Sequence, residues 1–198
     1  MFIRGRRLRQ NKNIRNLVEE TNLSVNDLIM PIFLIDGKSK SQKINSMPNI
    51  FRKTLDNQLK DISSAIKLGI NAIIIFPAIN QKLKDPLGKE ALNKKGLIPR
   101  AISTIKKKFP EILVITDVAL DPYNSDGHDG LLKNGEILND ETVEILCRQA
   151  CIHAEFGADI VAPSDMMDGR VAKIREALDR KGFYNTAIMS YAAKFAVL

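Results

Sequence analysis

Hydrophobic positions along this chain change their period repeatedly, and each change predicts a switch between helix and strand. Four aliphatic residues with the three-and-four spacing of one helical face are Leu55, Leu59, Ile62 and Ile66. Gly69 then suits the left-handed residue that ends many helices. Residues 72–76 read AIIIF without a polar interruption before Pro77, which predicts a strand buried on both faces.

The same alternation predicts further elements on both sides of this pair. Helices are predicted over 14–20, 98–109, 139–156 and 169–181, and strands over 28–34, from Leu113, over 159–162 and over 186–191. Either Asn139 or Asp140 is expected to cap the third of these helices. Polar loops are expected over 37–49 and 80–96. Helices that alternate with apolar strands indicate parallel βαβ units.

The predicted fold class is α/β, and within it a TIM (β/α)8 barrel. No G-x-G-x-x-G follows the first strand and no G-x-x-x-x-G-K-[ST] occurs, so a nucleotide-binding doubly wound sheet is disfavoured. A full barrel takes eight strands and about 250 residues, whereas this chain of 198 residues supplies five strands. We therefore expect an N-terminal arm at 1–12 and an incomplete barrel at 13–198. Because such a sheet exposes an apolar edge, the polypeptide alone is expected to be unstable or to aggregate.

Composition and charge exclude several classes of protein. A net charge of +7 is typical of proteins that bind nucleic acids, yet the basic residues of this chain are spread along its length. The one short cluster consists of Arg4, Arg6, Arg7 and Arg9, without interleaved aromatic residues, so no nucleic-acid partner is expected. No apolar run approaches the ~20 residues of a membrane helix, so no membrane association is expected either.

Two cysteines lie four residues apart within one predicted helix. Cys147 and Cys151 are expected to be reduced core residues of a cytoplasmic protein. A metal site that joins them to His153 is disfavoured, because the three residues do not share one helical face.

The first group of candidate functional residues lies where the predicted strand that begins at Leu113 continues into an acidic loop. Its polar residues are Asp117, Asp121, Asp126, His128 and Asp129, spread among turn-forming residues. Carboxylates after a buried strand suit metal binding or proton transfer. A solvated acidic loop is the alternative interpretation, and the pattern alone leaves both open.

The carboxyl ends of the strands carry the other candidates, since barrel chemistry occurs at that end. Ser164 and Asp165 follow one predicted strand, and Lys194 follows the apolar segment AIMSYAA. Poor hydration would lower the pKa of the Lys194 amine and make it a nucleophile for carbonyl carbons. The alternative is a lysine that extends its ammonium group to water near the end of the chain.

Four segments resemble the δ-aminolevulinic acid dehydratase (porphobilinogen synthase) family: RRLRQNKNIRNLVEET, ITDVALDPYNSDGHDG, GADIVAPSDMMDGRVAKIREALD and IMSYAAKFA. The resemblance implies a TIM barrel that condenses two 5-aminolevulinate molecules into porphobilinogen with loss of two waters. It implies that Lys194 is the first of two Schiff-base lysines and that Asp117 is an active-site acid. It further implies that Ser164 and Asp165 handle protons and hold the substrate amine.

The acidic loop distinguishes types within that family. Zinc-dependent members carry cysteines at the positions of Ala119, Asp121 and Asp129, so the resemblance implies no thiolate zinc site here. Mg²⁺ or a monovalent ion is expected instead, with Asp121 and Asp129 as candidate ligands and no organic cofactor. Asp126 stands where the family usually has histidine, and His128 is nearby, so both are assigned to a lid over the site.

Family members assemble as oligomers, commonly octamers, through the N-terminal arm, so a homo-oligomer is expected. After Lys194 and Phe195 this sequence reads AVL and ends, without the second Schiff-base lysine and the later arginines of the family. We therefore expect porphobilinogen synthase ancestry with no complete reaction by this chain alone. The alternative is a non-catalytic fragment that associates with full-length subunits. A frameshift, a degrading gene, a sequencing error or a partial sequence would each explain the ending.

Overall fold

The computed structural model describes residues 3–194, and its centre is a seven-stranded sheet. Five strands lie side by side in chain order: β1 (Met30–Leu34), β4 (Ala72–Pro77), β5 (Leu113–Val118), β8 (Ile160–Pro163) and β9 (Ala187–Ile188). Each neighbouring pair among them is parallel. Successive units of a (β/α)8 barrel have parallel strands in sequential order, so the predicted barrel arrangement is confirmed for these five strands.

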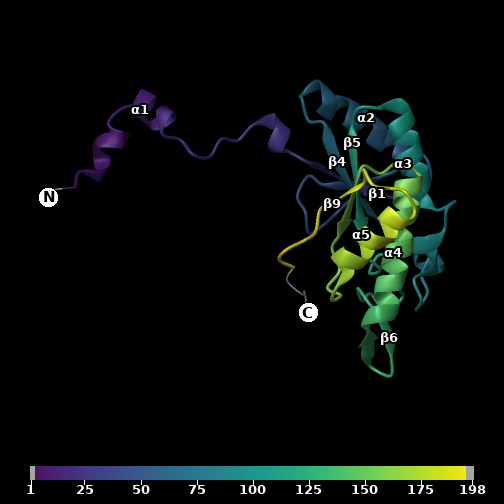
Figure 1. Ribbon diagram of the computed structural model, residues 1–198. Helices are drawn as coiled ribbons and strands as arrows, with labels where there is room; N and C mark the ends of the chain where they lie inside the picture. The colour runs from purple at the N-terminus through teal and green to yellow at the C-terminus, as the bar shows by residue number, and fades with distance from the viewer. Residues whose placement is uncertain (1–2, 195–198) are drawn as a thin grey trace.

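Helices cover one face of this sheet: α2 (Leu55–Lys67), α3 (Leu97–Lys108), α4 (Asn139–Glu155) and α5 (Arg170–Arg180) (Figure 1). Ile73 and Ile75 of β4 belong to the large core cluster that includes residues of α2 and α3. Ile74 between them belongs instead to a small cluster with Ile115 and Ala162. Since successive strand residues face opposite sides, the small cluster marks the concave, barrel-interior face.

Several predicted boundaries were wrong by a few residues. The first helix, α1 (Lys12–Leu17), ends three residues before the predicted position 20, and β1 begins at Met30 instead of residue 28. The last predicted strand, 186–191, is reduced to the two residues of β9. Short apolar runs predict that a strand exists, but its ends depend on which neighbour it pairs with.

The predicted cap of α4 was also wrong. The capping position is occupied by Leu138, which makes no side-chain capping bond. Asn139 instead reaches across to the loop before α5, where its Oδ1 accepts a hydrogen bond from the Asp168 amide at 2.8 Å. The amide group of Asn139 therefore contacts a distant loop that the local sequence does not reveal.

The sequence analysis missed several short elements. They are β2 (Ser41–Lys43) and β3 (Phe51–Lys53), the hairpin of β6 (Leu131–Lys133) and β7 (Glu136–Leu138), and four 3-10 turns, η1 (Gly5–Arg9), η2 (Val25–Asp27), η3 (Gln81–Leu83) and η4 (Lys89–Leu92). Elements of three to five residues are too short for periodicity to reveal. The hairpin did carry a signal: Asn134 and Gly135 both have positive φ, as the Asn-Gly turn of a tight hairpin requires.

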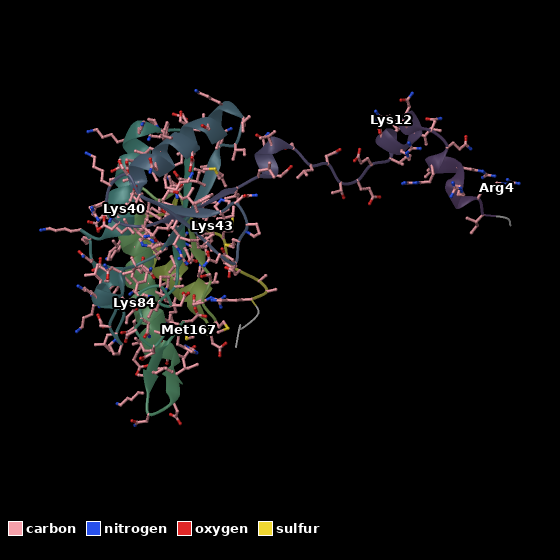
Figure 2. The ribbon with its side chains drawn as sticks, turned by 180° about the vertical axis from the view of Figure 1, so that it is seen from behind. Arg4, Lys12, Lys40, Lys43, Lys84 and Met167 are labelled. Carbon is pink, nitrogen blue, oxygen red and sulfur yellow. The ribbon has the colours of Figure 1, made fainter. Side chains whose placement is uncertain are left out.

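The N-terminal segment projects away from the body, with Arg4 and Lys12 far from the sheet (Figures 1 and 2). No residue from Ile3 to Ile29 is buried, so the exposed segment extends past the predicted arm 1–12. Among residues 3–194, no helix combines the length and the apolar character needed to cross a membrane.

Candidate active site

The carboxyl ends of β5 and β8 bring the first candidate residues together. Asp117 pairs in register with Ala162, and Ser164 follows directly after β8. Asp117 has the same parity as Ile115, so it faces the barrel interior, whereas Thr116 faces the helices. Both Asp117 and Ser164 are buried. The predicted convergence of these two side chains is therefore present.

The carboxyl group of Asp117 has a pKa near neutral pH. Burial is the largest influence and raises its pKa to about 7, with a further upward contribution from Asp121. The Ser164 hydroxyl and the Lys194 ammonium act in the opposite direction. Its Oδ1 is buried without a hydrogen-bond partner among the described residues. A carboxyl group with this pKa and a free oxygen suits proton exchange with a bound molecule at neutral pH.

Lys194 returns to the same site from the end of β9. Its Nζ donates a hydrogen bond to Asp129 Oδ2 at 2.8 Å. The two side chains are 29% and 7% exposed, so the ammonium group is bound to a buried carboxylate and does not extend freely into water. A protonated amine is no nucleophile, so the Lys194 amine cannot add to a carbonyl carbon while this ion pair persists.

Asp121 completes a pair of neighbouring carboxylates. Burial raises its pKa, and the negative charge of Asp129 raises it further. Within residues 3–194 no group of three or more His, Cys, Asp or Glu side chains is placed to hold a metal ion. Two carboxylates suit Mg²⁺, which often keeps several waters and takes one or two protein carboxylates, and do not suit a thiolate zinc site.

Asn124, which the sequence analysis missed, folds the loop between Asp121 and Asp129. Its Oδ1 accepts a hydrogen bond from the Asp126 amide at 2.6 Å, and its Nδ2 donates to the Gly130 carbonyl at 3.4 Å. The signal was available, because asparagine side chains commonly bond the backbone two residues ahead. The loop thereby returns on itself and brings the two carboxylates together.

The two residues assigned to a lid lie on the outer part of this loop. Asp126 is exposed, and His128 is half-buried. Nδ1 of His128 accepts a hydrogen bond from the Gly130 amide at 3.0 Å. His128 therefore has a local structural contact within the loop.

Asp165 is engaged inside the protein. Its Oδ1 accepts a hydrogen bond from the Met167 amide at 2.8 Å, and its Oδ2 forms an ion pair with Arg170 Nε at 3.2 Å. Burial raises its pKa, although both of these contacts oppose the rise. Arg170 was not singled out from the sequence, although it lies in the quoted segment APSDMMDGR.

Behind β5, His153 is a core residue. It is 1% exposed, and its Nδ1 lies 3.0 Å from Thr116 Oγ1. Burial lowers its pKa to about 3, so the imidazole is neutral.

The thiols of Cys147 and Cys151 are free, and burial raises the pKa of Cys147 to about 11, which disfavours the reactive thiolate.

Comparison with known proteins identifies the family. A family model described as Delta-aminolevulinic acid dehydratase matches residues 2–198. The chain belongs to the delta-aminolevulinic acid dehydratase family. The Bradyrhizobium diazoefficiens delta-aminolevulinic acid dehydratase is 52% identical over 99% of this chain and 56% of its own length. The chloroplastic enzyme of Selaginella martensii is 49% identical over 98% of this chain and 46% of its own length.

A solved structure of a family member shares the fold. The crystal structure of the Toxoplasma gondii ME49 enzyme (porphobilinogen synthase), in complex with its product porphobilinogen, superposes with a TM-score of 0.94 at 45% identity. The match covers 100% of this chain and 56% of that chain. This confirms the resemblance and the barrel fold inferred from the sequence. The chain spans about half the length of the relatives that it matches.

Proposed function

We propose that this chain carries a Schiff-base half-site of porphobilinogen synthase, the enzyme that condenses two 5-aminolevulinate molecules into porphobilinogen. The observation that carries the proposal is the placement of Lys194 beside Asp129 at the mouth where Asp117 lies. The proposal is further supported by membership of the family.

Formation of the Schiff base needs an amine, a group that donates a proton and a binding site for the substrate. The free amine of Lys194 adds to the ketone carbon of 5-aminolevulinate, and the resulting carbinolamine loses its hydroxyl as water to leave a C=N bond. Asp117 can donate the proton for this departure, since its pKa lies near neutrality. Ser164, in contact with Asp117, is proposed to bind the substrate amine. The hydrogen bond at Asp165 Oδ1 and the ion pair between Oδ2 and Arg170 favour an indirect role for that residue.

Borohydride reduction in the presence of 5-aminolevulinate tests the half-site. We expect a covalent adduct on Lys194 of the purified chain, detected by peptide mass spectrometry, because reduction of the imine makes the bond permanent. The variant Lys194→Arg should lose the adduct completely, since its guanidinium group forms no imine under these conditions.

A matched control is Lys173→Met, since Lys173 is an exposed lysine on α5. This variant should keep the Lys194 adduct at the wild-type yield. A wild-type chain that shows no adduct on Lys194, while a full-length relative shows one in parallel, contradicts the proposed half-site.

A second candidate function is a non-catalytic subunit that assembles with full-length subunits. It is favoured by the exposed apolar side chains of the N-terminal segment, where Ile3 is 86%, Leu17 85% and Leu23 82% exposed. Such surfaces are typical of segments that pack against another chain. We propose that this segment mediates oligomer formation. Co-purification with a full-length relative, without any Lys194 adduct, distinguishes this candidate from the first.

We also propose that the acidic loop takes Mg²⁺ rather than Zn²⁺, through Asp121 and Asp129. A bound cation would supply positive charge to the acidic loop, held by these two carboxylates. Mg²⁺ should raise the unfolding free energy of the wild type by about 2.7 kcal/mol when free Mg²⁺ is 100 times its Kd. The variant Asp121→Asn should show no such rise in a thermal denaturation series.

The exposed Asp126 offers the control for this series, because Asp126→Asn removes an equal charge from the same loop. It should respond to Mg²⁺ as the wild type does. Equal responses from all three proteins, or none from the wild type, refute a site at Asp121.

For the cellular compartment we propose the cytoplasm, because free thiols such as Cys147 and Cys151 suit a reducing environment.

A further inference from the structure

Arg170 connects three points around the mouth of the barrel. It is the first residue of α5, preceded by Gly169 in a left-handed conformation with φ of 75°. Its Nη1 donates a hydrogen bond to the Met167 carbonyl at 3.0 Å, and its Nη2 donates to the Tyr191 carbonyl at 3.4 Å. Its Nε lies 3.2 Å from Asp165 Oδ2. One guanidinium group therefore links the loop after β8 to the segment after β9.

The ion pair between Asp165 and Arg170 is buried, which strengthens the attraction between the two charges. The Asp165 side chain is 0% exposed and that of Arg170 is 18% exposed, so the ion pair is largely shielded from water. Asp165 Oδ2 and Arg170 Nε make no hydrogen bond among the described residues, so the buried carboxylate attracts the guanidinium group through its charge. The hydrogen bonds to the Met167 and Tyr191 carbonyls fix the directions of the other two nitrogens. The direction taken by Nη2 is toward the Tyr191 carbonyl.

Tyr191 is the last anchored residue before Lys194. Its amide donates to the Pro163 carbonyl at 3.3 Å, and its carbonyl accepts from Arg170. Among the described residues, no backbone hydrogen bond of Ala192, Ala193 or Lys194 continues this pattern. The Lys194 side chain is held by Asp129, so the position of its backbone depends on how firmly Tyr191 is held.

We infer that Arg170 is a positioning residue for Lys194, acting through the Tyr191 carbonyl, and that Asp165 serves to orient Arg170. The inference rests on the proposed function of Lys194 as the imine-forming lysine. Displacement of a reacting group by about 1 Å can reduce a rate by about 100-fold, so loss of this anchor should slow attack on the substrate ketone.

Arg175 provides a matched comparison on the same helix. Its Nη1 donates to the Thr186 carbonyl at 2.6 Å and its Nη2 to the Phe183 carbonyl at 3.0 Å, while Asp179 is its carboxylate partner. It thus resembles Arg170 in bridging α5 to the β9 region. However, it anchors the chain where β9 begins, at the end opposite Lys194.

The experiment compares Arg170→Met, Asp165→Asn and Arg175→Met in the full chain. The measured quantity is the rate of the borohydride-trapped adduct on Lys194, corrected for the folded fraction from circular dichroism. We expect Arg170→Met to lower the rate by about 10- to 100-fold and Asp165→Asn to lower it less. Arg175→Met should reduce thermal stability yet keep the rate per folded molecule within about twofold of wild type, because its anchor is remote from the reacting amine.

A second readout needs no substrate. Acetylation of Lys194 by a small succinimidyl ester should be slow in the wild type, where the ammonium is paired with Asp129. It should rise relative to exposed Lys173 in Arg170→Met and Asp165→Asn, but not in Arg175→Met. Failure of the proposed function appears as no wild-type adduct, with acetylation still reporting the position of Lys194.

The inference itself is overturned by unchanged acetylation and adduct rates in the Arg170 and Asp165 variants. It is equally overturned if Arg175→Met changes both quantities as much as Arg170→Met does. If Arg170→Met does not fold, Asp165→Asn decides the question, because it nearly preserves the side-chain shape and removes only the charge that orients the guanidinium.

Discussion

Relative to the wild type, the variant Asp117→Asn should gain stability as the pH rises from about 4 to about 7. Burial raises the pKa of Asp117 from 3.8 to about 7 in the folded protein. Between these values the folded state binds more protons than the unfolded state, so the wild-type contribution declines as the pH rises. A shift of this size corresponds to about 4 kcal/mol, and asparagine does not titrate. The difference in unfolding free energy should level off above pH 7.

Urea denaturation at a series of pH values measures this difference. Asp126→Asn is the control, since Asp126 is an exposed aspartate on the same loop. This variant keeps Asp117, so the decline in stability that Asp117 causes should persist in it. A constant difference between Asp117→Asn and the wild type would mean that Asp117 ionises at the ordinary pH of a carboxyl group.

The variant His153→Gln should show the opposite dependence, gaining stability over the wild type as the pH falls from about 6.5 to about 3. Burial lowers the pKa of His153 from 6.5 to about 3, so the unfolded state binds more protons across this range. Wild-type stability from this group is therefore present above pH 6.5 and lost on acidification, by up to about 5 kcal/mol. Glutamine keeps a polar group near Thr116 Oγ1 and does not titrate.

The other histidine of the chain supplies the comparison. His128→Gln removes a half-buried imidazole from the acidic loop and keeps His153, so the acid sensitivity that His153 causes should persist in this variant. Acid denaturation monitored by circular dichroism distinguishes the two variants. Equal acid sensitivity of His153→Gln and the wild type would show that the buried imidazole does not control the transition.

These two groups act on opposite faces of one strand. Asp117 faces the barrel interior, and His153 contacts the neighbouring Thr116 from the helix side. Because their contributions change with pH in opposite directions between about 4 and 6.5, they offset each other in the wild type. Each single variant should therefore reveal a slope that the intact protein conceals.

The sequence by itself determined the order of helices and parallel strands, because buried strands are continuously apolar and amphipathic helices repeat every three or four residues. It also determined that Asp117 and Ser164 would meet, since the carboxyl ends of neighbouring parallel strands lie together. The motifs around Lys194 were sufficient to indicate the family, which the match over residues 2–198 confirms.

Only the tertiary structure decided which partner each polar group has. Asp129, expected as a metal ligand, forms an ion pair with Lys194 from 65 residues away. Asp165 pairs with Arg170, and Asn139 contacts Asp168 instead of capping its helix. The short strand β9 likewise depends on pairing with β8. Such contacts join segments distant in sequence, and their geometry follows from packing the sheet and helices, which local periodicity does not encode.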